Sequence, residues 1–154
     1  MFEQLFPQRV DNTYHGHKLA FWLFGLVVLV KSAISVNSIF NGFFVATSAD
    51  GIPLATYSSA GAQAFVSLFA LWGLSHLMIC LLCILVLIRY RGFVPLMFTL
   101  LLVEHLGRKL ILQIIPIAKT GMSHGFAINL VLVVVMIVGL ALSLWSRNNA
   151  QAQP

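Results

Sequence analysis

Four apolar stretches, each long enough to cross a lipid bilayer, constrain this chain more than any other feature of its sequence. They lie at about 19–44, 62–88, 93–117 and 125–145. A hydrocarbon core about 30 Å thick needs roughly 20 helical residues for each crossing. The chain is 60% hydrophobic and 8% charged, and a soluble domain of 154 residues cannot bury that much apolar surface. The sequence therefore predicts an integral membrane protein.

The stretches are continuous rather than alternating in polarity, which favours helices over the strands of a membrane barrel. We expect an all-α polytopic membrane protein, a four-transmembrane-helix bundle in which neighbouring helices are antiparallel. Segment 1–18 is predicted to be a cytoplasmic N-terminal segment, 19–146 the transmembrane domain, and 147–154 a disordered polar tail. No part of this plan leaves room for a soluble catalytic module, so a non-enzymatic role is favoured.

The basic residues near the ends of the stretches predict an orientation. By the positive-inside rule, the side of the membrane with more Lys and Arg is cytoplasmic. One side has Arg9, Lys18, Arg89, Arg91 and Arg147, whereas the other has only Lys119. We therefore expect both termini in the cytoplasm, with the protein in a bacterial-type inner (plasma) membrane. Because the net charge of +5 arises largely from these flanking residues, it does not indicate a nucleic-acid partner.

The third stretch contains TLLLVEHLGRKLILQII, which places Glu104, His105, Arg108 and Lys109 near the middle of an otherwise apolar run. A charged side chain at the centre of a membrane helix costs about 2.5–3.5 kcal/mol on the insertion scale. This stretch is therefore marginal as an isolated span. It needs polar partners inside the bundle.

Two other stretches offer such partners at a matching depth. At 1.5 Å rise per residue, Lys31, His76 and His105 each lie about 20 Å from the predicted cytoplasmic edge. Glu104 shares this layer, and Arg108 and Lys109 lie about one turn further out. The predicted ligand- or partner-binding site is therefore Lys31, His76, Glu104, His105, Arg108 and Lys109.

The charges in this layer do not balance. Glu104 and Arg108 are four residues apart on one helix face and are expected to pair. No other Asp or Glu lies within a stretch, so Lys31 and Lys109 are expected to lack a carboxylate from this chain. We expect the excess positive charge to engage an anion from outside the chain. That anion is an acidic residue of another membrane protein or a second copy, a lipid, or a small ligand, which predicts a membrane subunit or accessory protein.

Three alternative hypotheses stay open from the sequence alone. The layer could be a static network that only fixes helix packing. His76 and His105 could be axial ligands of a b-type haem, or line a quinone site, because one histidine from each of two facing helices holds haem in four-helix bundles. The same residues could instead form the proton or anion pathway of a small transporter.

Two further patterns receive structural interpretations. Cys80 and Cys83 form a C-x-x-C pair near the predicted cytoplasmic end of the second stretch, without a second pair to exchange with. They are predicted to be buried, unreactive thiols. The fourth stretch has no charge and is predicted to be a wall of the bundle, packed through the small residues Gly139 and Ser143. No motif is specific enough to assign a family.

Overall fold

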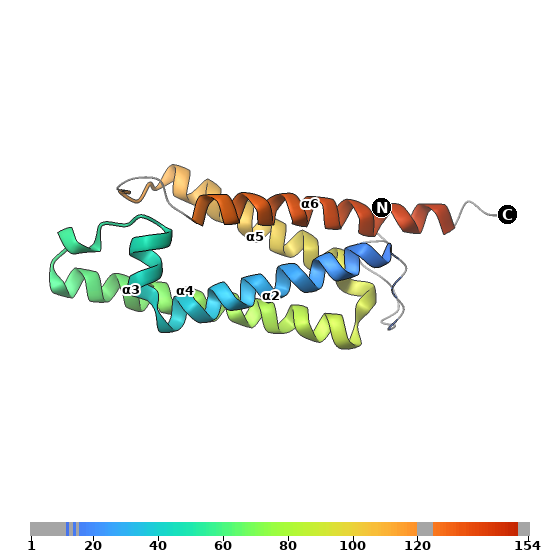
Figure 1. Cartoon of the computed structure of the whole chain (residues 1–154), viewed down its shortest axis with the longest axis horizontal. Helices are drawn as coiled ribbons and strands as arrows, with labels where there is room; N and C mark the ends of the chain where they lie inside the picture. The colour runs from blue at the N-terminus through green and yellow to red at the C-terminus, as the bar shows by residue number, and fades with distance from the viewer. Residues whose placement is uncertain (1–11, 13, 15, 120–124, 151–154) are drawn as a thin grey trace.

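The computed structural model describes residues 12, 14, 16–119 and 125–150, and these residues form helices and connecting turns without any strand (Figure 1). Four long helices run lengthwise beside one another. They are α2 (Lys18–Phe40), α4 (Ser59–Arg89), α5 (Val94–Ile114) and α6 (Gly125–Ala150). The short elements between them are α3 (Gly42–Phe44), the π-helical turn η1 (Val45–Ala49), and the 3₁₀ turns η2 (Leu54–Thr56) and η3 (Arg91–Phe93).

Helices α2, α4 and α6 are long and apolar enough to cross a membrane, by length and composition. Helix α5 has 21 residues, or roughly 31 Å, which is also sufficient length. It does not meet the same criterion, because Glu104, Arg108 and Lys109 interrupt its apolar sequence. The predicted all-helical fold is thus confirmed, and three helices suited to crossing a membrane suggest an integral membrane protein. That α5 is a fourth span stays a prediction.

The helix ends differ from the predicted boundaries by a few residues, each for a local reason. Helix α2 ends at Phe40, and the chain turns at Asn41 before α3 begins. Helix α5 ends at Ile114, just before Pro116, whose ring cannot continue a helix. Helix α6 continues to Ala150 because neither Gly nor Pro interrupts its last turns, so residues 147–150 belong to a helix and not to the expected disordered tail. The rest of that tail lies outside the described residues, as does most of segment 1–18.

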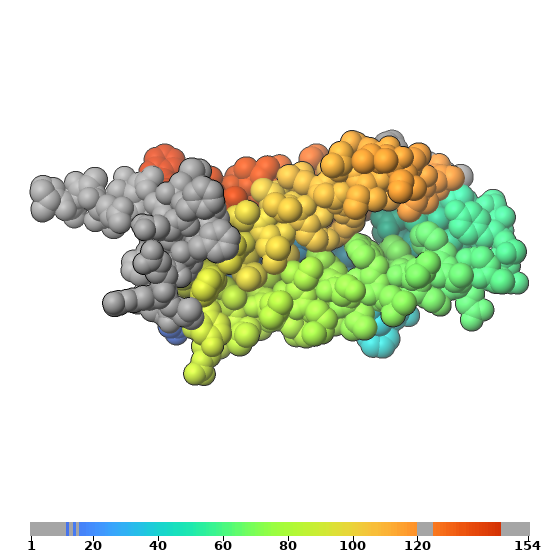
Figure 2. Space-filling view, turned by 180° about the vertical axis from the view of Figure 1, so that it is seen from behind, coloured from blue at the N-terminus to red at the C-terminus, as the bar shows by residue number. Residues whose placement is uncertain are grey.

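The packing order around the bundle is not the order along the chain. Helix α2 packs most extensively on α4 and also contacts α6, while α5 packs on α6. Helices α4 and α5 follow each other through the short turn η3, yet they contact each other much less. Figure 2 shows α4 (green) and α5 (yellow to orange) diverging from this turn, with α2 (blue) visible between them. The bundle is therefore open along a groove between α4 and α5.

Two glycines allow the helices to approach closely. A Cβ added at Gly73 of α4 would lie 3.0 Å from the Cβ of Ser38 on α2. A Cβ added at Gly139 of α6 would lie 2.5 Å from the ring of Phe98 on α5. Small residues at such crossings let backbones approach in membrane proteins, where the hydrophobic effect does not drive helix association. The predicted packing role of Gly139 is confirmed by this contact.

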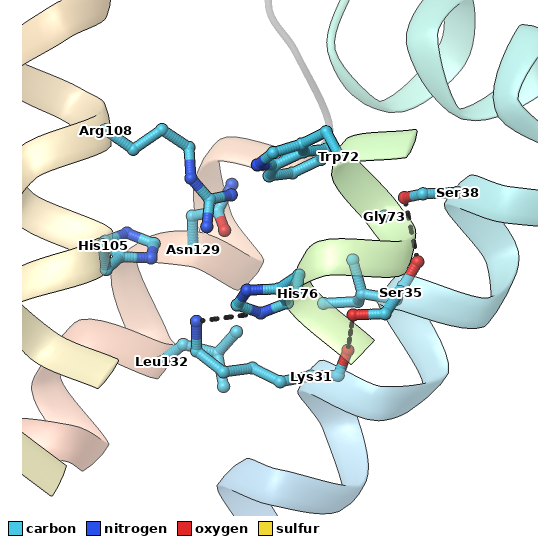
Figure 3. A pocket seen from close by; sticks show the side chains of 11 residues that line it. Lys31, Ser35, Ser38, Trp72, Gly73, His76, His105, Arg108, Asn129 and Leu132 are labelled. Carbon is cyan, nitrogen blue, oxygen red and sulfur yellow. Dashed lines mark hydrogen bonds between the residues drawn. The ribbon is translucent and has the colours of Figure 1, made fainter. Parts of the chain in front are cut away.

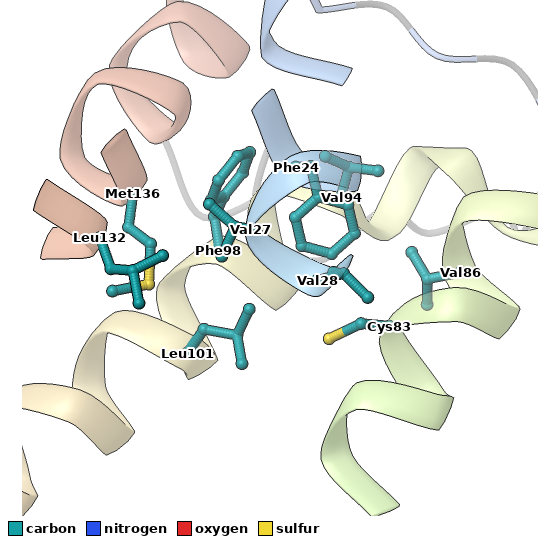
Figure 4. Packing of buried hydrophobic residues seen from close by; sticks show 10 residues of the cluster. All are labelled: Phe24, Val27, Val28, Cys83, Val86, Val94, Phe98, Leu101, Leu132 and Met136. Carbon is teal, nitrogen blue, oxygen red and sulfur yellow. The ribbon is translucent and has the colours of Figure 1, made fainter. Parts of the chain in front are cut away.

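The half of the bundle nearest the α4–α5 turn contains an apolar core (Figure 4). The rings of Phe24 and Phe98 meet edge to face at its centre, with centroids 4.9 Å apart. The buried members come from all four long helices: Phe24, Val27, Val28, Cys83, Val86, Val94, Phe98, Leu101, Leu132 and Met136. This core brings the polar residues of the next helical turns, Lys31 and His105, to the same level.

A small cap closes the opposite end of α2 and α4. The chain from α3 to α4 folds back so that Ala46, Ile52 and Leu54 are buried together, with Phe65 of α4 packed against them. Gly51 permits this reversal because its φ of 69° lies in the left-handed region. The segment between α3 and α4 is therefore a folded element with its own apolar contacts.

Candidate functional site

Three helices bring a set of ionisable side chains into direct contact, which we call the polar cluster: Lys31, His76, Glu104 and Arg108. The Lys31 Nζ atom lies 3.4 Å from the Glu104 Oε2 atom and 3.4 Å from the His76 Nε2 atom. The other carboxylate oxygen of Glu104 lies 3.6 Å from the His76 Nδ1 atom and also pairs with the Arg108 guanidinium. Helices α2, α4 and α5 therefore meet through charges at this level.

Each helix presents its part of the cluster on a polar stripe. On α2 the buried residues include Lys31, Ser35 and Ser38, spaced so that they share one face. The hydroxyl of Ser35 donates to the Lys31 backbone carbonyl at 2.8 Å, and that of Ser38 donates to the carbonyl of Ile34 at 2.9 Å. Because both serines bond within their own helix, they do not satisfy the cluster. On α4, Gly73 lies one turn from His76 and lets α2 approach it.

The tautomer of His76 follows from the charge on Lys31. An ammonium group only donates hydrogen bonds, so a charged Lys31 requires the Nε2 atom of His76 to accept. The proton of the neutral imidazole then resides on Nδ1, which faces the Glu104 carboxylate across 3.6 Å. Lys31, His76 and Glu104 thus form a closed triangle. In this arrangement the histidine bridges an ammonium and a carboxylate.

One carboxylate serves two buried cations. Both Lys31 and Arg108 contact Glu104, so the expectation that Lys31 has no carboxylate from this chain is wrong. Side chains of α4 and α5 meet across the groove at this level, and Lys31 of α2 reaches Glu104 of α5. The predicted excess of positive charge nevertheless persists in the cluster, because two formal positive charges share one negative charge. With Lys31 only 3% exposed, bulk water does not compensate this excess directly.

Aromatic contacts hold Arg108 over the cluster. Its guanidinium lies 4.3 Å from the centroid of the Trp72 ring, within the range of a cation–π interaction. The same indole stacks beside His76, with centroids 6.2 Å apart and planes inclined by 22°. The side chain of Arg108 is 29% exposed and that of Glu104 is 21% exposed, whereas Lys31 and His76 are buried. Access to the cluster is therefore from the α5 side.

A small pocket of about 20 Å³ lies against the cluster (Figure 3). Figure 3 shows His105 and Arg108 extending from α5 towards His76 and Trp72 of α4, with Lys31 approaching from α2. The pocket is lined by two cations, two histidines, an amide, an indole and small or apolar residues, namely Lys31, Ile34, Ser35, Ser38, Trp72, Gly73, His76, His105, Arg108, Asn129 and Leu132. No acidic side chain is among these lining residues.

Several buried nitrogen atoms around this pocket have no hydrogen-bond partner within the part of the chain that the structure describes. They are His76 Nδ1, His105 Nε2 and Arg108 Nε. An unsatisfied buried polar group costs about 1–3 kcal/mol, and more if it is charged. All three belong to residues that line the pocket. Because Lys31 and Arg108 can only donate hydrogen bonds and no acidic side chain lines the pocket, the site is short of acceptors.

The six residues predicted from the sequence do not all enter the site. The structure brings Lys31, His76, Glu104 and Arg108 into contact, and His105, 5% exposed, lines the adjoining pocket. Lys109 is exposed and makes no ion pair with any carboxylate among the described residues. It follows Arg108 directly, and a rotation of 100° per residue turns it away from the cluster.

Sequence reasoning missed two contributors to the pocket. Asn129 of α6 lines it, although the fourth stretch was expected to be only a wall. The available signal was that Asn129 is the one amide side chain between residues 125 and 145. The other is Trp72, which lies about one helical turn before His76, but its contact with Arg108 depends on how α4 and α5 approach each other.

The geometry around His76 bears on the haem and quinone hypotheses, which stay predictions. Both ring nitrogens of His76 face charged groups of the cluster, so neither is directed at an open iron site. Pockets for cofactor-sized ligands occupy about 300–1,000 Å³, whereas this pocket has room for about one water-sized occupant. No group of three or more potential metal-ligating His, Cys, Asp or Glu residues occurs among the described residues. The hypothesis of a proton pathway stays a prediction.

The two cysteines are free thiols buried in α4, as predicted.

Comparison of the chain with protein-family models, with curated proteins and with solved structures finds no match. Function is therefore inferred from the polar cluster and its pocket alone.

Proposed function

We propose that this chain is an integral membrane binding protein, a subunit or accessory factor, in which the polar cluster engages an anionic group. The group comes from a partner's acidic residue, a lipid or a small ligand. The observation that carries this proposal is that Lys31 and Arg108 share the single carboxylate of Glu104 while both line a pocket without acidic residues. An anion in that pocket would bring the formal charge of the site to neutrality.

A charge imbalance of this kind is costly inside a membrane. Transferring an ion to a low-dielectric interior carries a penalty of several kcal/mol even after relaxation. At an effective dielectric constant of about 20, a unit charge 4 Å away contributes about 4 kcal/mol of attraction. Intramembrane ionisable residues are accordingly rare, and they mark binding sites or pathways more often than packing contacts. A purely structural network would have been cheaper with a second carboxylate or without Lys31.

We further propose that α5 is a fourth span and that consecutive long helices are antiparallel, with both termini cytoplasmic in an inner membrane. Three observations support this arrangement. Helix α5 lies along α6 for much of its length (Figure 1) and packs on it. Two of its charged side chains, Glu104 and Arg108, contact the cluster. The end of α4 and the start of α5 lie at one end of the bundle, and the end of α5 and the start of α6 lie at the other.

Reporter fusions test this topology. Four spans with a cytoplasmic N-terminus put a reporter inserted after Gly51 outside and one fused after Pro154 inside. Three spans, with α5 lying on the membrane, put both reporters outside. Opposite signals are expected, and identical signals would contradict the fourth span.

Removal and re-addition of free anions test the binding function, because an added anion can take the place of a lipid or of a partner's acidic residue in the site. The protein is purified in mild detergent, and half of it is washed extensively in buffer whose only anion is the bulky gluconate. We expect the wash to lower the melting temperature of the wild type, since any ligand that binds only the folded state stabilises it. Lys31→Met should be insensitive to the wash, because the excess charge is gone.

Lys109→Met is the matched control for this experiment. It removes the same charge from an exposed position outside the cluster. The control should respond to the wash as the wild type does. A wild-type protein whose melting is unchanged after exhaustive washing, and remains unchanged when anions are added back, would refute the proposed function.

A further inference from the structure

We propose that the pocket between α2, α4, α5 and α6 binds a small monovalent anion of halide size, such as chloride, held by Lys31, Arg108 and His105. This inference rests on the proposed function and names its ligand class. Three independent properties of the pocket point to this occupant: its size, the hydrogen-bonding character of its lining, and its charge.

Size restricts the occupant to very few atoms. A pocket of about 20 Å³ holds about one water-sized occupant. A phosphate group, a sulfate or the ring of an aromatic acid does not fit this space without moving the helices. Gly73 contributes to the restriction, because the missing side chain lets α2 and α4 close the pocket on one side.

The lining offers donors to a single acceptor. His105 Nε2 and Arg108 Nε are buried without a hydrogen-bond partner among the described residues. Ammonium and guanidinium groups only donate hydrogen bonds, so Lys31 and Arg108 require an acceptor in the pocket. The hydroxyls of Ser35 and Ser38 are already engaged with backbone carbonyls. A spherical anion can accept from several directions at once, as this lining requires.

Charge distinguishes the anion from a water molecule. A water could accept from His105 and Arg108, but it would leave two cations sharing one carboxylate. Glu104 contacts Lys31 and Arg108 without being one of the residues that line the pocket, so its negative charge does not occupy that space. A monovalent anion neutralises the site, whereas a divalent anion would reverse its charge.

Access runs past the partly exposed pair on α5. The side chains of Glu104 and Arg108 are 21% and 29% exposed, whereas Lys31 and His105 are almost fully buried. The anion therefore enters beside Arg108, whose guanidinium lies over Trp72. The groove between α4 and α5 provides this route.

Thermal melting of the detergent-solubilised full chain tests the inference. Protein washed into sodium gluconate is titrated with sodium chloride, bromide, nitrate, sulfate or decanoate, with gluconate adjusted to keep ionic strength constant. We expect chloride and bromide to raise the melting temperature along a saturable curve. Sulfate should have no saturable effect, because it is both too large and divalent.

Substitutions of pocket residues test whether chloride binds in this pocket. Lys31→Met should weaken the apparent chloride affinity about tenfold or more, since hydrogen bonds to charged groups are worth roughly that factor. Asn129→Leu removes a neutral polar group of the lining at similar volume, and should weaken chloride binding about fivefold without altering the charge of the cluster. Lys109→Met should keep the wild-type affinity. If Lys31→Met does not fold, Asn129→Leu still decides the location.

The remaining outcomes distinguish a halide from the other classes of anion. Equal effects of sulfate and chloride at the same ionic strength, or a wild-type chloride affinity in Asn129→Leu and Lys31→Met, would overturn the inference. Stabilisation by decanoate alone would overturn it while leaving the proposed anion-binding function intact, because that ligand bears its carboxylate on a lipid-like chain. Restoration by none of the anions, after a wash that lowered the melting temperature, would likewise reject a halide and favour a partner's acidic residue.

Discussion

The two halves of this bundle are held together by different kinds of interaction. Near the α4–α5 turn, all four long helices meet through an apolar core in which Phe24 and Phe98 are fully buried (Figure 4). One or two turns further along, α4 and α5 diverge, and the helices contact each other through Lys31, His76 and Glu104. The pocket of Figure 3 lies beside these residues. The apolar half packs through hydrophobic side chains, whereas the polar half has a pocket whose lining includes nitrogens without a hydrogen-bond partner among the described residues.

The contrast shows that apolar packing holds one half of the bundle, whereas the other half has charged contacts and a pocket in place of such packing. Van der Waals packing of small and apolar residues stabilises helix association in a membrane without any ligand. Buried charges need close partners, and a missing partner is more costly there than in water. We therefore expect stability to depend on solution anions in the polar half and to be indifferent to them in the apolar half. The following predictions test this difference.

Glu104→Gln should have the largest effect. It leaves Lys31 and Arg108 next to each other without a carboxylate, and removing one partner of a buried ion pair typically costs 3–5 kcal/mol. Because the Glu104 side chain is partly exposed, we expect a loss of about 3 kcal/mol in the free energy of unfolding. Unfolding in mixed micelles measures it. High chloride should reduce the loss, and a loss below about 1 kcal/mol would show that the cations do not depend on Glu104.

Gly139→Ala tests the apolar half. The added Cβ would lie 2.5 Å from the Phe98 ring, so α5 and α6 must shift, and overpacking of this kind costs about 1–3 kcal/mol. The loss should be the same in chloride and in gluconate. Gly107→Ala on α5 is the matched control, because nothing lies within 4 Å of its added Cβ. A destabilised control, or a Gly139→Ala loss that varies with the anion, would contradict the assignment of two distinct halves.

Single removal of either cation should have a smaller effect than loss of Glu104. Lys31→Met leaves the Glu104–Arg108 pair and Arg108→Leu leaves the Lys31–Glu104 pair, so each variant is neutral in formal charge. We expect Lys31→Met to change the free energy of unfolding by less than about 1 kcal/mol. Arg108→Leu should lose up to about 1 kcal/mol more, because the contact with Trp72 disappears.

The double variant Lys31→Met, Arg108→Leu completes this test. It leaves Glu104 as a lone carboxylate, so the combined loss should exceed the sum of the single losses in a double-mutant cycle. Additive effects would mean that the two cations do not share Glu104, which would break the triangle described here.

Asp50→Asn concerns the cap and should have the smallest effect. Burial raises the pKa of Asp50 above its usual value, an effect that the neighbouring positive charge of Lys119 opposes. The folded state then binds the Asp50 proton more tightly than the unfolded state does. Stability should fall slightly as the pH rises from about 4 through the folded-state pKa, and then stay constant. Asp50→Asn should remove this fall in melts recorded from pH 4 to 7, and an unchanged pH profile would contradict it.

Much of the architecture could be predicted because it follows from local properties of the chain. The length and apolarity of the four stretches indicated a helical membrane protein, since a hydrocarbon core accepts only backbones that satisfy their own hydrogen bonds. The spacing of Lys31, Ser35 and Ser38 also follows helical periodicity, and all three are buried on α2. The cost of central charges indicated that α5 needed partners within the bundle.

The choice of partners could not be predicted in the same way. The sequence favoured an isolated Glu104–Arg108 pair, because residues four apart on a helix are certain to be near each other. Contact between Lys31 and Glu104 depends instead on two helices that are distant in the chain, and the structure brings them within 3.4 Å. Lys109 was assigned to the site from its depth, although its position around α5 leaves it exposed and outside the polar cluster.

By itself, the sequence determined that this chain is helical, belongs in a membrane and gathers ionisable groups at one depth, because apolar length and burial cost act on each segment separately. Only the tertiary structure decided that α4 and α5 diverge, that two cations share one carboxylate, and that Asn129 joins the pocket. These features depend on the order and rotation of packed helices, which contacts such as those of Gly73 and Gly139 set. Periodicity fixes the direction of a side chain around its own helix, but not the neighbour that it meets.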